Sequence, residues 1–191
     1  MAFVSGPSGK MKTRATYEDL LAVPDHKVAE ILDGELFVSP RPAAPHARAA
    51  SVIGADIGSP FDRGRGGPGG WWVLYEPELH FGEDVLVPDL AGWRRERMPA
   101  VPNAPFFTLA PDWVCEVVSP STEQIDRRRK QPIYRREGVL HLWLVNPLAR
   151  TLEVYRSSPD GWLLAATHAG AEQVRAEPFE AVELELAALW I

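Results

Sequence analysis

Alternating apolar and polar residues predict a hairpin early in the chain. Residues 27–32 read Lys-Val-Ala-Glu-Ile-Leu, residues 33–34 are the turn dipeptide Asp-Gly, and residues 35–38 return as a second strand. Strand alternation places Glu30 on the same face as two aliphatic neighbours. Glu30 is therefore either an acid held against an apolar face or an edge-strand glutamate in water, and the pattern leaves both readings open.

The next stretch alternates predicted helices with β-branched and aromatic runs. A capping signal at residues 16–19 begins a short helix, and small apolar residues at helical spacing predict a second helix from residue 46 to about residue 57. Strands are expected at residues 71–75, 78–81 and 85–93. Pro88 indicates an edge or a bulge in the third strand. Asp89 beside it is either a turn residue or a side chain aimed at a functional site.

The most apolar run, Trp-Val-Cys-Glu-Val-Val at residues 113–118, predicts a strand buried on both faces. Glu116 lies in its middle, where an unpaired carboxylate is costly, so it needs a partner. Ser121 and Gln124 have the spacing of a capping box, so a helix should begin there. That helix would carry Lys130 back over the end of the strand. The sequence thus predicts a buried acid close to a lysine at one strand-to-helix turn.

The rest of the pattern completes one domain. Pro132 is expected to kink the helix just after Lys130, and Gly138 to end it. Further elements are predicted as a strand at 139–145, a hairpin at 151–156 and 162–167, and an amphipathic segment at 182–190. Helices around a mostly central set of strands indicate an α/β (α+β) fold with one mixed sheet. We expect a disordered segment at residues 1–15 and a single domain over residues 16–191.

Composition narrows the functional classes. A chain of 191 residues with 46% hydrophobic content suits one sizeable core, and a net charge of −6 excludes a uniformly basic nucleic-acid coat. The single cysteine, Cys115, excludes an internal disulfide, and strand alternation turns it away from Glu116 as a small buried residue. No stretch approaches the roughly 18 apolar residues of a membrane span. Together with the absence of a signal-peptide pattern, this favours a cytoplasmic protein without a membrane partner.

Three acids on separate predicted strands, Glu30, Asp89 and Glu116, lie in apolar settings, and Lys130 follows the last of them. Converging carboxylates repel one another and need a counter-charge. Mg²⁺ or Mn²⁺ can supply it, since such ions are typically held by one or two carboxylates together with a substrate phosphate. Lys130 would then orient an attacking water or stabilise developing charge. This combination indicates a nuclease site.

Five motifs connect the chain to a known family: Glu30-Ile-Leu-Asp-Gly-Glu35, Val87-Pro-Asp-Leu90, Glu116-Val-Val-Ser-Pro-Ser-Thr122, Asp126 with Lys130 and Tyr134, and Leu142-Trp-Leu-Val-Asn-Pro147. They resemble the Uma-type putative restriction endonucleases of the PD-(D/E)XK superfamily, from Thr16 to the C-terminus. The resemblance implies a restriction-endonuclease-like core. It also implies metal binding by Asp89 and Glu116, assistance from Glu30, and Lys130 as the catalytic lysine.

The chain departs from the superfamily pattern at one position. The usual lysine lies two residues after the acid, where this chain has Val118, and the resemblance implies that the lysine has moved to the following helix, at Lys130. Arg127, Arg128 and Arg129 are its neighbours, but arginine stays protonated and suits a phosphate clamp better than a base.

DNA is the expected partner, and weaker signals concern how it binds. Arg127, Arg128 and Arg129 either contact its phosphates or form a solvated helix face. His46 either holds a substrate phosphate or is an ordinary surface histidine near a helix start. Because cutting both strands usually requires two active sites, a homodimer is expected.

Other hydrolase classes fit poorly. The sequence has neither a Gly-x-Ser-x-Gly elbow nor a His-Glu-x-x-His helix. A glycosidase also uses two acids, but it has no use for Lys130 in this arrangement. We therefore predict a metal-dependent endonuclease that hydrolyses DNA phosphodiester bonds. The alternative is a non-catalytic DNA-binding or assembly domain that retains the nuclease fold.

Overall fold

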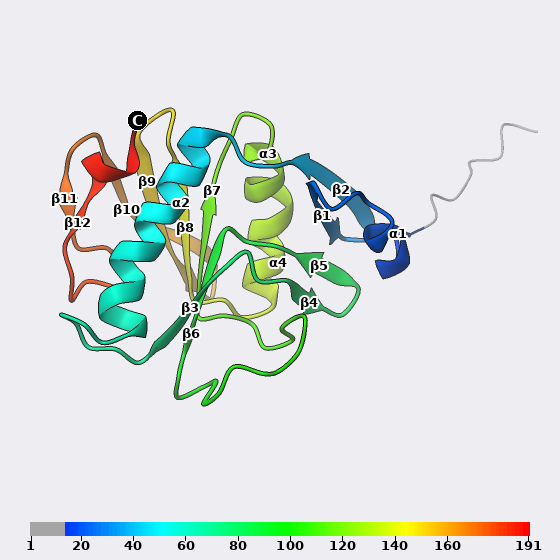
Figure 1. Ribbon diagram of the computed structural model, residues 1–191, viewed down its shortest axis with the longest axis horizontal. Helices are drawn as coiled ribbons and strands as arrows, with labels where there is room; N and C mark the ends of the chain where they lie inside the picture. The colour runs from blue at the N-terminus through cyan, green and yellow to red at the C-terminus, as the bar shows by residue number, and fades with distance from the viewer. Residues whose placement is uncertain (1–13) are drawn as a thin grey trace, which may run out of the picture.

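The structure is a computed structural model that describes residues 14–191. Disorder was expected at residues 1–15, and residues 1–13 of that segment lie outside the described residues. A central sheet separates two helical layers, with α2 on one face and the run from α3 to α4 on the other (Figure 1). A smaller sheet with α1 extends to one side (Figure 1).

The central sheet is mixed, as the sequence predicted, but the prediction of one sheet is wrong, because the described residues also form a four-stranded and a two-stranded sheet. Its six strands have the order β10-β9-β8-β7-β6-β3. Their bounds are β3 Trp71–Tyr75, β6 Leu90–Arg94, β7 Trp113–Val117, β8 His141–Asn146, β9 Thr151–Ser158 and β10 Gly161–Ala169. Strands β7 and β8 are parallel, and the other neighbouring pairs are antiparallel.

The second sheet contains the predicted hairpin. Its four strands have the order β2-β1-β5-β4, with bounds β1 Lys27–Leu32, β2 Glu35–Pro40, β4 Leu79–Phe81 and β5 Asp84–Leu86. Asp33 and Gly34 turn the hairpin with φ angles of 53° and 81°. A two-stranded sheet pairs β11 Gln173–Val174 with β12 Leu184–Glu185.

The prediction of a single strand at residues 85–93 is wrong. The chain forms β5 in the smaller sheet, leaves it at Val87, and joins the central sheet as β6. Pro88 lies in this crossing, where it has no N–H to give to a strand ladder. The two sheets therefore meet beside Asp89.

The helices are short apart from one. Their bounds are α1 Tyr17–Leu21, α2 Ala44–Ile57, the π-helical turn η1 Gly58–Asp62, α3 Glu123–Ile125, the π-helical turn η2 Asp126–Lys130, α4 Gln131–Arg136 and the 3₁₀ turn η3 Leu186–Leu189. Thr16 and Asp19 form the capping box predicted for α1. The segment expected to be amphipathic, residues 182–190, consists of β12 and η3.

The capping box predicted at Ser121 is wrong. Thr122 is the N-cap of α3 and makes no side-chain cap hydrogen bond. The Ser121 hydroxyl lies 3.0 Å from the Ser119 hydroxyl instead, so it is used within the turn. Pro132 falls in the first turn of α4, directly after η2. The kink expected just after Lys130 stays a prediction, while a π-helical turn ends at Lys130 directly before α4.

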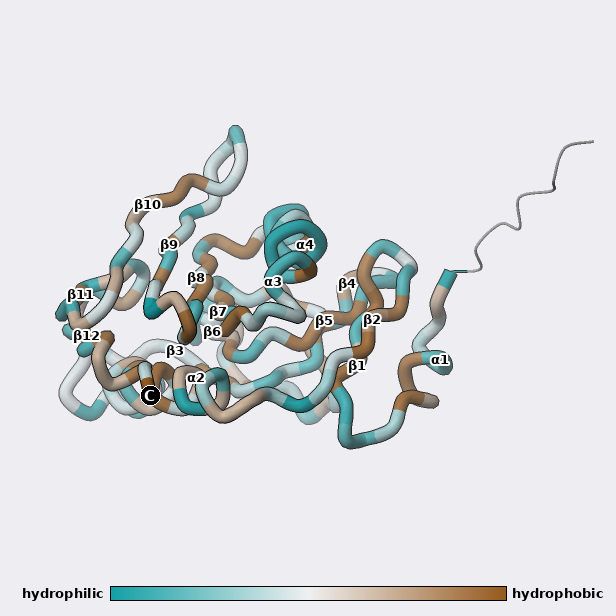
Figure 2. Tube along the Cα trace, turned by 90° about the horizontal axis from the view of Figure 1, so that it is seen from above, coloured by the Kyte–Doolittle hydropathy of each residue, from teal (hydrophilic) through white to brown (hydrophobic). Residues whose placement is uncertain are grey.

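Strand β7 is buried along its whole length and separates two apolar cores. Trp113, Cys115 and Val117 belong to the core under α2, and Val114 belongs to the core under α4. Cys115 therefore faces away from Glu116, as predicted. The strands between the helical layers carry much of the apolar sequence, whereas α4 shows a mainly hydrophilic trace (Figure 2). Within residues 14–191, no helix combines the length and apolarity needed to cross a bilayer.

Candidate active site at the junction of the two sheets

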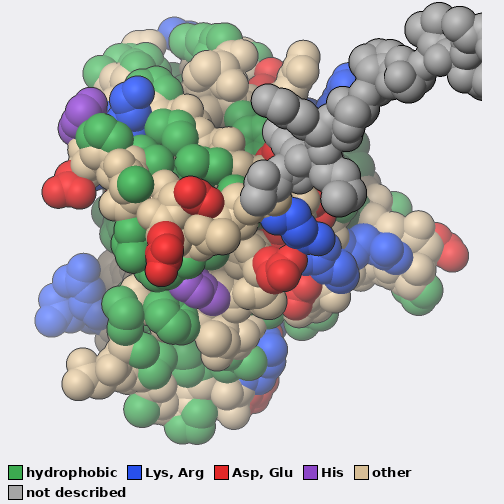
Figure 3. Space-filling model, turned by 90° about the vertical axis from the view of Figure 1, so that its right-hand side faces the viewer, with side chains coloured by type: hydrophobic (Ala, Val, Ile, Leu, Met, Phe, Trp, Pro, Cys, Tyr) green, Lys and Arg blue, Asp and Glu red, His purple; other side chains and the backbone are tan. Residues whose placement is uncertain are grey.

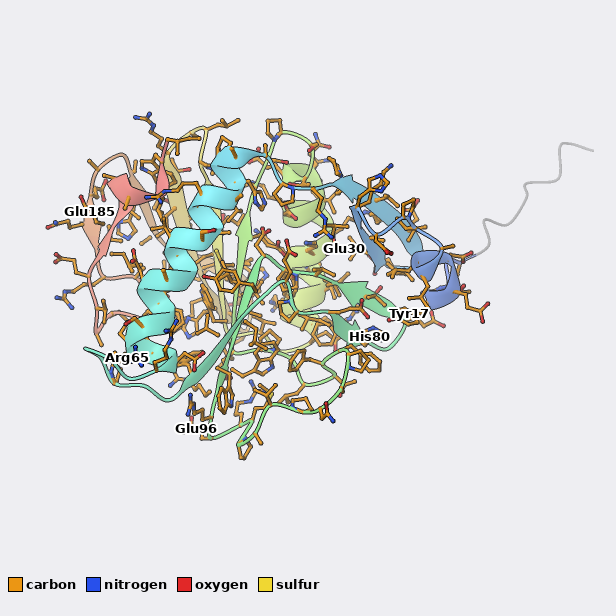
Figure 4. The ribbon with its side chains drawn as sticks, in the orientation of Figure 1. Tyr17, Glu30, Arg65, His80, Glu96 and Glu185 are labelled. Atoms are coloured by element: carbon orange, nitrogen blue, oxygen red, sulfur yellow. The ribbon has the colours of Figure 1, made fainter. Side chains whose placement is uncertain are left out.

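A pocket of about 320 Å³ lies where the two sheets meet. Parts of both sheets, the start of α2, and the turn after β7 line it. All four residues predicted to act in catalysis reach this pocket: Glu30, Asp89, Glu116 and Lys130. Glu30 belongs to β1, and its side chain points toward the helical run that carries Lys130 (Figure 4).

Lys130 is the centre of a buried ionic cluster. Its Nζ atom lies 2.8 Å from Glu30 Oε1, 3.0 Å from Glu116 Oε1 and 3.6 Å from Asp126 Oδ1. None of these four side chains is more than 8% exposed. The predicted proximity of Glu116 and Lys130 is therefore present, and two further acids share the same ammonium.

The helical run supplies three groups to this cluster at intervals of four residues. Asp126, Lys130 and Tyr134 project from the same side of the run, and the Tyr134 hydroxyl donates a 2.5 Å hydrogen bond to Glu116 Oε1. Sequence reasoning gave Asp126 and Tyr134 no role of their own. Their spacing was the available signal, since residues four apart lie on one helical face.

Burial and crowded negative charge dominate the electrostatics of the site. Burial raises the pKa of Glu116 well above its usual value, and nearby acids add to the rise, while Lys130 opposes it. Burial likewise raises the pKa of Asp126 to about 6, again against the effect of Lys130. Burial alone would lower the pKa of Lys130, but Glu116 and Glu30 raise it well above its usual value. Lys130 is therefore a stable ammonium among an excess of acids.

Asp89 is held separately, in the crossing between β5 and β6. Its Oδ2 atom accepts a 2.7 Å hydrogen bond from the Val117 backbone N–H. Its Oδ1 atom lies 3.3 Å from His46 Nε2, which projects from the first turn of α2. Burial lowers the pKa of His46, but the hydrogen bond and charge of Asp89 outweigh that effect and raise it overall. The structure thus places His46 against Asp89, and phosphate binding by His46 stays a prediction.

The pocket offers oxygen donors that suit a hard cation. Within residues 14–191, no group of three or more His, Cys, Asp and Glu side chains is arranged to hold a metal. Asp89 and Glu116 nevertheless both line the pocket. Both side-chain hydrogen bonds of Glu116 to described residues end on Oε1, and neither involves Oε2. Two carboxylates completed by water and substrate phosphate are a common way to hold Mg²⁺, so the donors fit Mg²⁺ or Mn²⁺.

The three neighbouring arginines are not brought into the pocket. Arg127 forms ion pairs with Glu123 at 2.9 Å and Glu153 at 2.7 Å. Arg129 pairs with Glu35 at 3.2 Å. Arg128 is exposed and makes no ion pair with any residue in the described part of the chain. Phosphate contact by these three stays a prediction for a surface outside the pocket.

Comparisons with known proteins support the fold and the family. The model of a family described as "Uma2: Putative restriction endonuclease" matches residues 14–188. No curated protein matches the chain. The crystal structure of "a putative nuclease belonging to DUF820" from Anabaena variabilis superposes with a TM-score of 0.71. It shares 23% identity, and the match covers 92% of this chain and 97% of that one, so the expected restriction-endonuclease-like fold class is confirmed.

Proposed function

Because the chain belongs to the Uma2 family of putative restriction endonucleases, we propose that it is a metal-dependent endonuclease that hydrolyses DNA phosphodiester bonds. One observation supports this most directly: Lys130 Nζ lies 3.0 Å from Glu116 Oε1 in a pocket that Asp89 also lines. Two carboxylates and a cation around one cavity are a set of groups that can support metal-assisted phosphodiester hydrolysis.

Asp89 and Glu116 are the proposed holders of Mg²⁺ or Mn²⁺. When bound, such an ion supplies positive charge to the scissile phosphate and makes an attacking water more acidic. The protein prepares the carboxylates for this task. His46 and the Val117 N–H each hold one oxygen of Asp89. Tyr134 and Lys130 both hold Oε1 of Glu116, which keeps the carboxylate in one orientation.

Lys130 acts as a fixed positive charge. Because its pKa is raised, it is protonated at neutral pH and is unsuited to be a general base. Its ammonium instead attracts the phosphate and stabilises negative charge that develops during attack. Glu30 positions it: Glu30 Oε1 forms a 2.8 Å ion pair with Lys130 Nζ and accepts a 2.8 Å hydrogen bond from the Val87 N–H. This is a concrete form of the assisting role expected for Glu30.

Cleavage of supercoiled plasmid by purified protein tests the proposal. We expect nicking or linearisation with Mg²⁺ or Mn²⁺ and none after addition of EDTA. Asp89→Asn, Glu116→Gln and Lys130→Met should each reduce the rate by at least about a hundredfold, on the scale of lost transition-state stabilisation. Arg65→Ala is a matched control, since Arg65 is exposed and lies far from Glu30 in Figure 4.

Folding must be checked beside activity, because the cluster is buried. Circular dichroism spectra should show that each inactive variant is folded at the assay temperature. If DNA is bound equally by wild type and variants and is never cut, the protein is a DNA-binding or assembly domain and the proposal fails. The expected homodimer remains a prediction, which analytical ultracentrifugation with and without DNA can test.

A further inference from the structure

The pocket contains few cations for a site that would bind a polyanion. Among the described residues, Arg41 is the one arginine that lines it, beside His46 and Lys130. On the visible part of the face in Figure 3, Lys and Arg side chains form a small group with Asp and Glu side chains beside it, and no broad basic patch is seen. A phosphate that enters the pocket therefore meets very few positive side chains.

Arg41 is held at the mouth of this pocket. It lies between Pro40 and Pro42 in the connection from β2 to α2, where the following proline restricts its backbone to extended conformations. Its Nη2 atom donates a 2.9 Å hydrogen bond to the Asp25 carbonyl. Arg41 also lines a neighbouring hollow of about 280 Å³. The guanidinium thus stands at the boundary between the pocket and a second open space.

The counter-ion of Arg41 is loosely bound. Arg41 Nη1 lies 3.6 Å from Glu76 Oε2, and the two side chains are 55% and 44% exposed. Exposed pairs of this kind contribute little to stability, so another anion can displace the carboxylate. A phosphate can accept two parallel N–H donors from the planar guanidinium, which makes it a strong competitor.

Glu76 is in turn fixed relative to the active site. Its φ angle is 43°, a left-handed conformation that is uncommon for glutamate, and its N–H donates to the Asp89 carbonyl at 3.1 Å. Unusual backbone conformations of this kind cluster at functional sites. The residue that pairs with Arg41 is therefore attached to the same crossing that carries Asp89.

We propose that Arg41 binds a DNA backbone phosphate beside the scissile one, and that Glu76 occupies the guanidinium until DNA displaces it. This inference rests on the proposed nuclease function. It makes Arg41 a substrate-binding residue and Glu76 a competitor for the same guanidinium. The two residues should therefore affect DNA affinity in opposite directions.

Binding of a short fluorescein-labelled DNA duplex in EDTA tests the inference without cleavage. Arg41→Ala should weaken binding on the order of tenfold, as for a lost hydrogen bond between charged groups, and should reduce the slope of log affinity against log salt by about one. The affinity of Arg41→Lys should fall between those of wild type and Arg41→Ala, because lysine keeps the positive charge but cannot donate two parallel hydrogen bonds to one phosphate. Glu76→Gln should tighten binding roughly two- to fivefold, the value of an exposed ion pair.

Charge-matched controls separate this contact from general electrostatics. Arg65→Ala and Glu96→Gln make the same charge changes at exposed positions far from Glu30 (Figure 4). They should leave affinity nearly unchanged. In a double-mutant cycle, the gain from Glu76→Gln should disappear when Arg41 is already alanine.

The results distinguish this inference from the proposed function. The inference is overturned, even if plasmid is cut, by either of two results. One is an equal salt slope for wild type and Arg41→Ala, and the other is an equal gain in affinity from Glu76→Gln with Arg41 present and with Arg41 replaced by alanine. Binding that depends on Arg41 as described, by a protein that never cuts, would uphold the phosphate contact and overturn the nuclease function. Thermal melts of each variant show whether a loss of binding reflects a loss of folding.

Discussion

Replacing Lys130 by methionine keeps an unbranched side chain and removes the ammonium that three buried carboxylates share. Removing one partner of a buried ionic cluster costs about 3–5 kcal/mol, because the remaining charges lose their compensation. A chain of this length loses about 2–4 °C in Tm per kcal/mol. We therefore expect the Tm of Lys130→Met to fall by roughly 6–20 °C near neutral pH.

The loss of stability should depend on pH with a defined sign. Burial already raises the pKa of Glu116 and Asp126, and Lys130 opposes both shifts, so its removal raises both values further. A carboxyl group with a raised folded-state pKa destabilises the fold as pH rises from its unfolded value, about 4, through its folded value. The stability difference between wild type and Lys130→Met should therefore be smaller at a pH of about 5 than at about 8.

Thermal unfolding followed by circular dichroism in EDTA at these two pH values is the assay. Arg128→Met is the matched control, because Arg128 lies on the same helical run, is exposed, and pairs with no described residue. Its effect should stay within about 0.5 kcal/mol. A loss for Lys130→Met that is equal at both pH values, or no larger than that of Arg128→Met, would refute the view that the lysine compensates buried acids.

Three further predictions each concern a single side chain. His46→Ala should weaken Mn²⁺ binding, measured by calorimetry, by about 10–100-fold because Asp89 loses its orienting partner. His46→Gln can still donate a hydrogen bond and should lose less affinity for Mn²⁺, so equal losses for the two variants would contradict this prediction. Tyr134→Phe should cost about 1.5–3 kcal/mol in urea unfolding, since Glu116 loses a buried donor; an unchanged midpoint would contradict it. Cys115 is buried and burial raises the pKa of its thiol, so a thiol reagent should label it only after unfolding, and rapid labelling of the folded protein would count against the buried position.

Local sequence rules predicted the elements whose determinants are close together. The first hairpin was predictable because alternation and an Asp-Gly turn act within a few residues. The strand around Glu116 was predictable because an apolar run of this length, rich in β-branched residues, suits a doubly buried strand. Its partner Lys130 was predictable because a buried carboxylate requires a cation and the following helix was expected to carry Lys130 back over the end of the strand.

The missed features depend on contacts distant in sequence. The crossing at Val87 shows that a proline which weakens a strand can mark its transfer to another sheet, and this depends on where the second sheet lies. The ion pair of Arg127 with Glu153 on β9, 26 residues away, was also not foreseen, and the phosphate contact expected of Arg127 stays a prediction. Helical spacing gives no information about a partner on another strand. The capping box predicted at Ser121 failed for a local reason. The Ser121 hydroxyl lies 3.0 Å from the Ser119 hydroxyl and is used within the turn instead of at the start of the helix.

Val118 stands where the superfamily pattern has its lysine, and the proposed catalytic lysine, Lys130, lies on the following helical run instead. Val118 is 1% exposed and packs in the core that also contains Ile133 and Tyr134 of α4. An apolar residue at the usual lysine position therefore helps to hold the helical run against β7, and that packing brings Lys130 Nζ to Glu116 across 14 residues of sequence. Electrostatic stabilisation depends on the separation of charges and on burial, and is indifferent to the covalent path between them. The spatial pair is thus the feature to compare among nucleases of this fold.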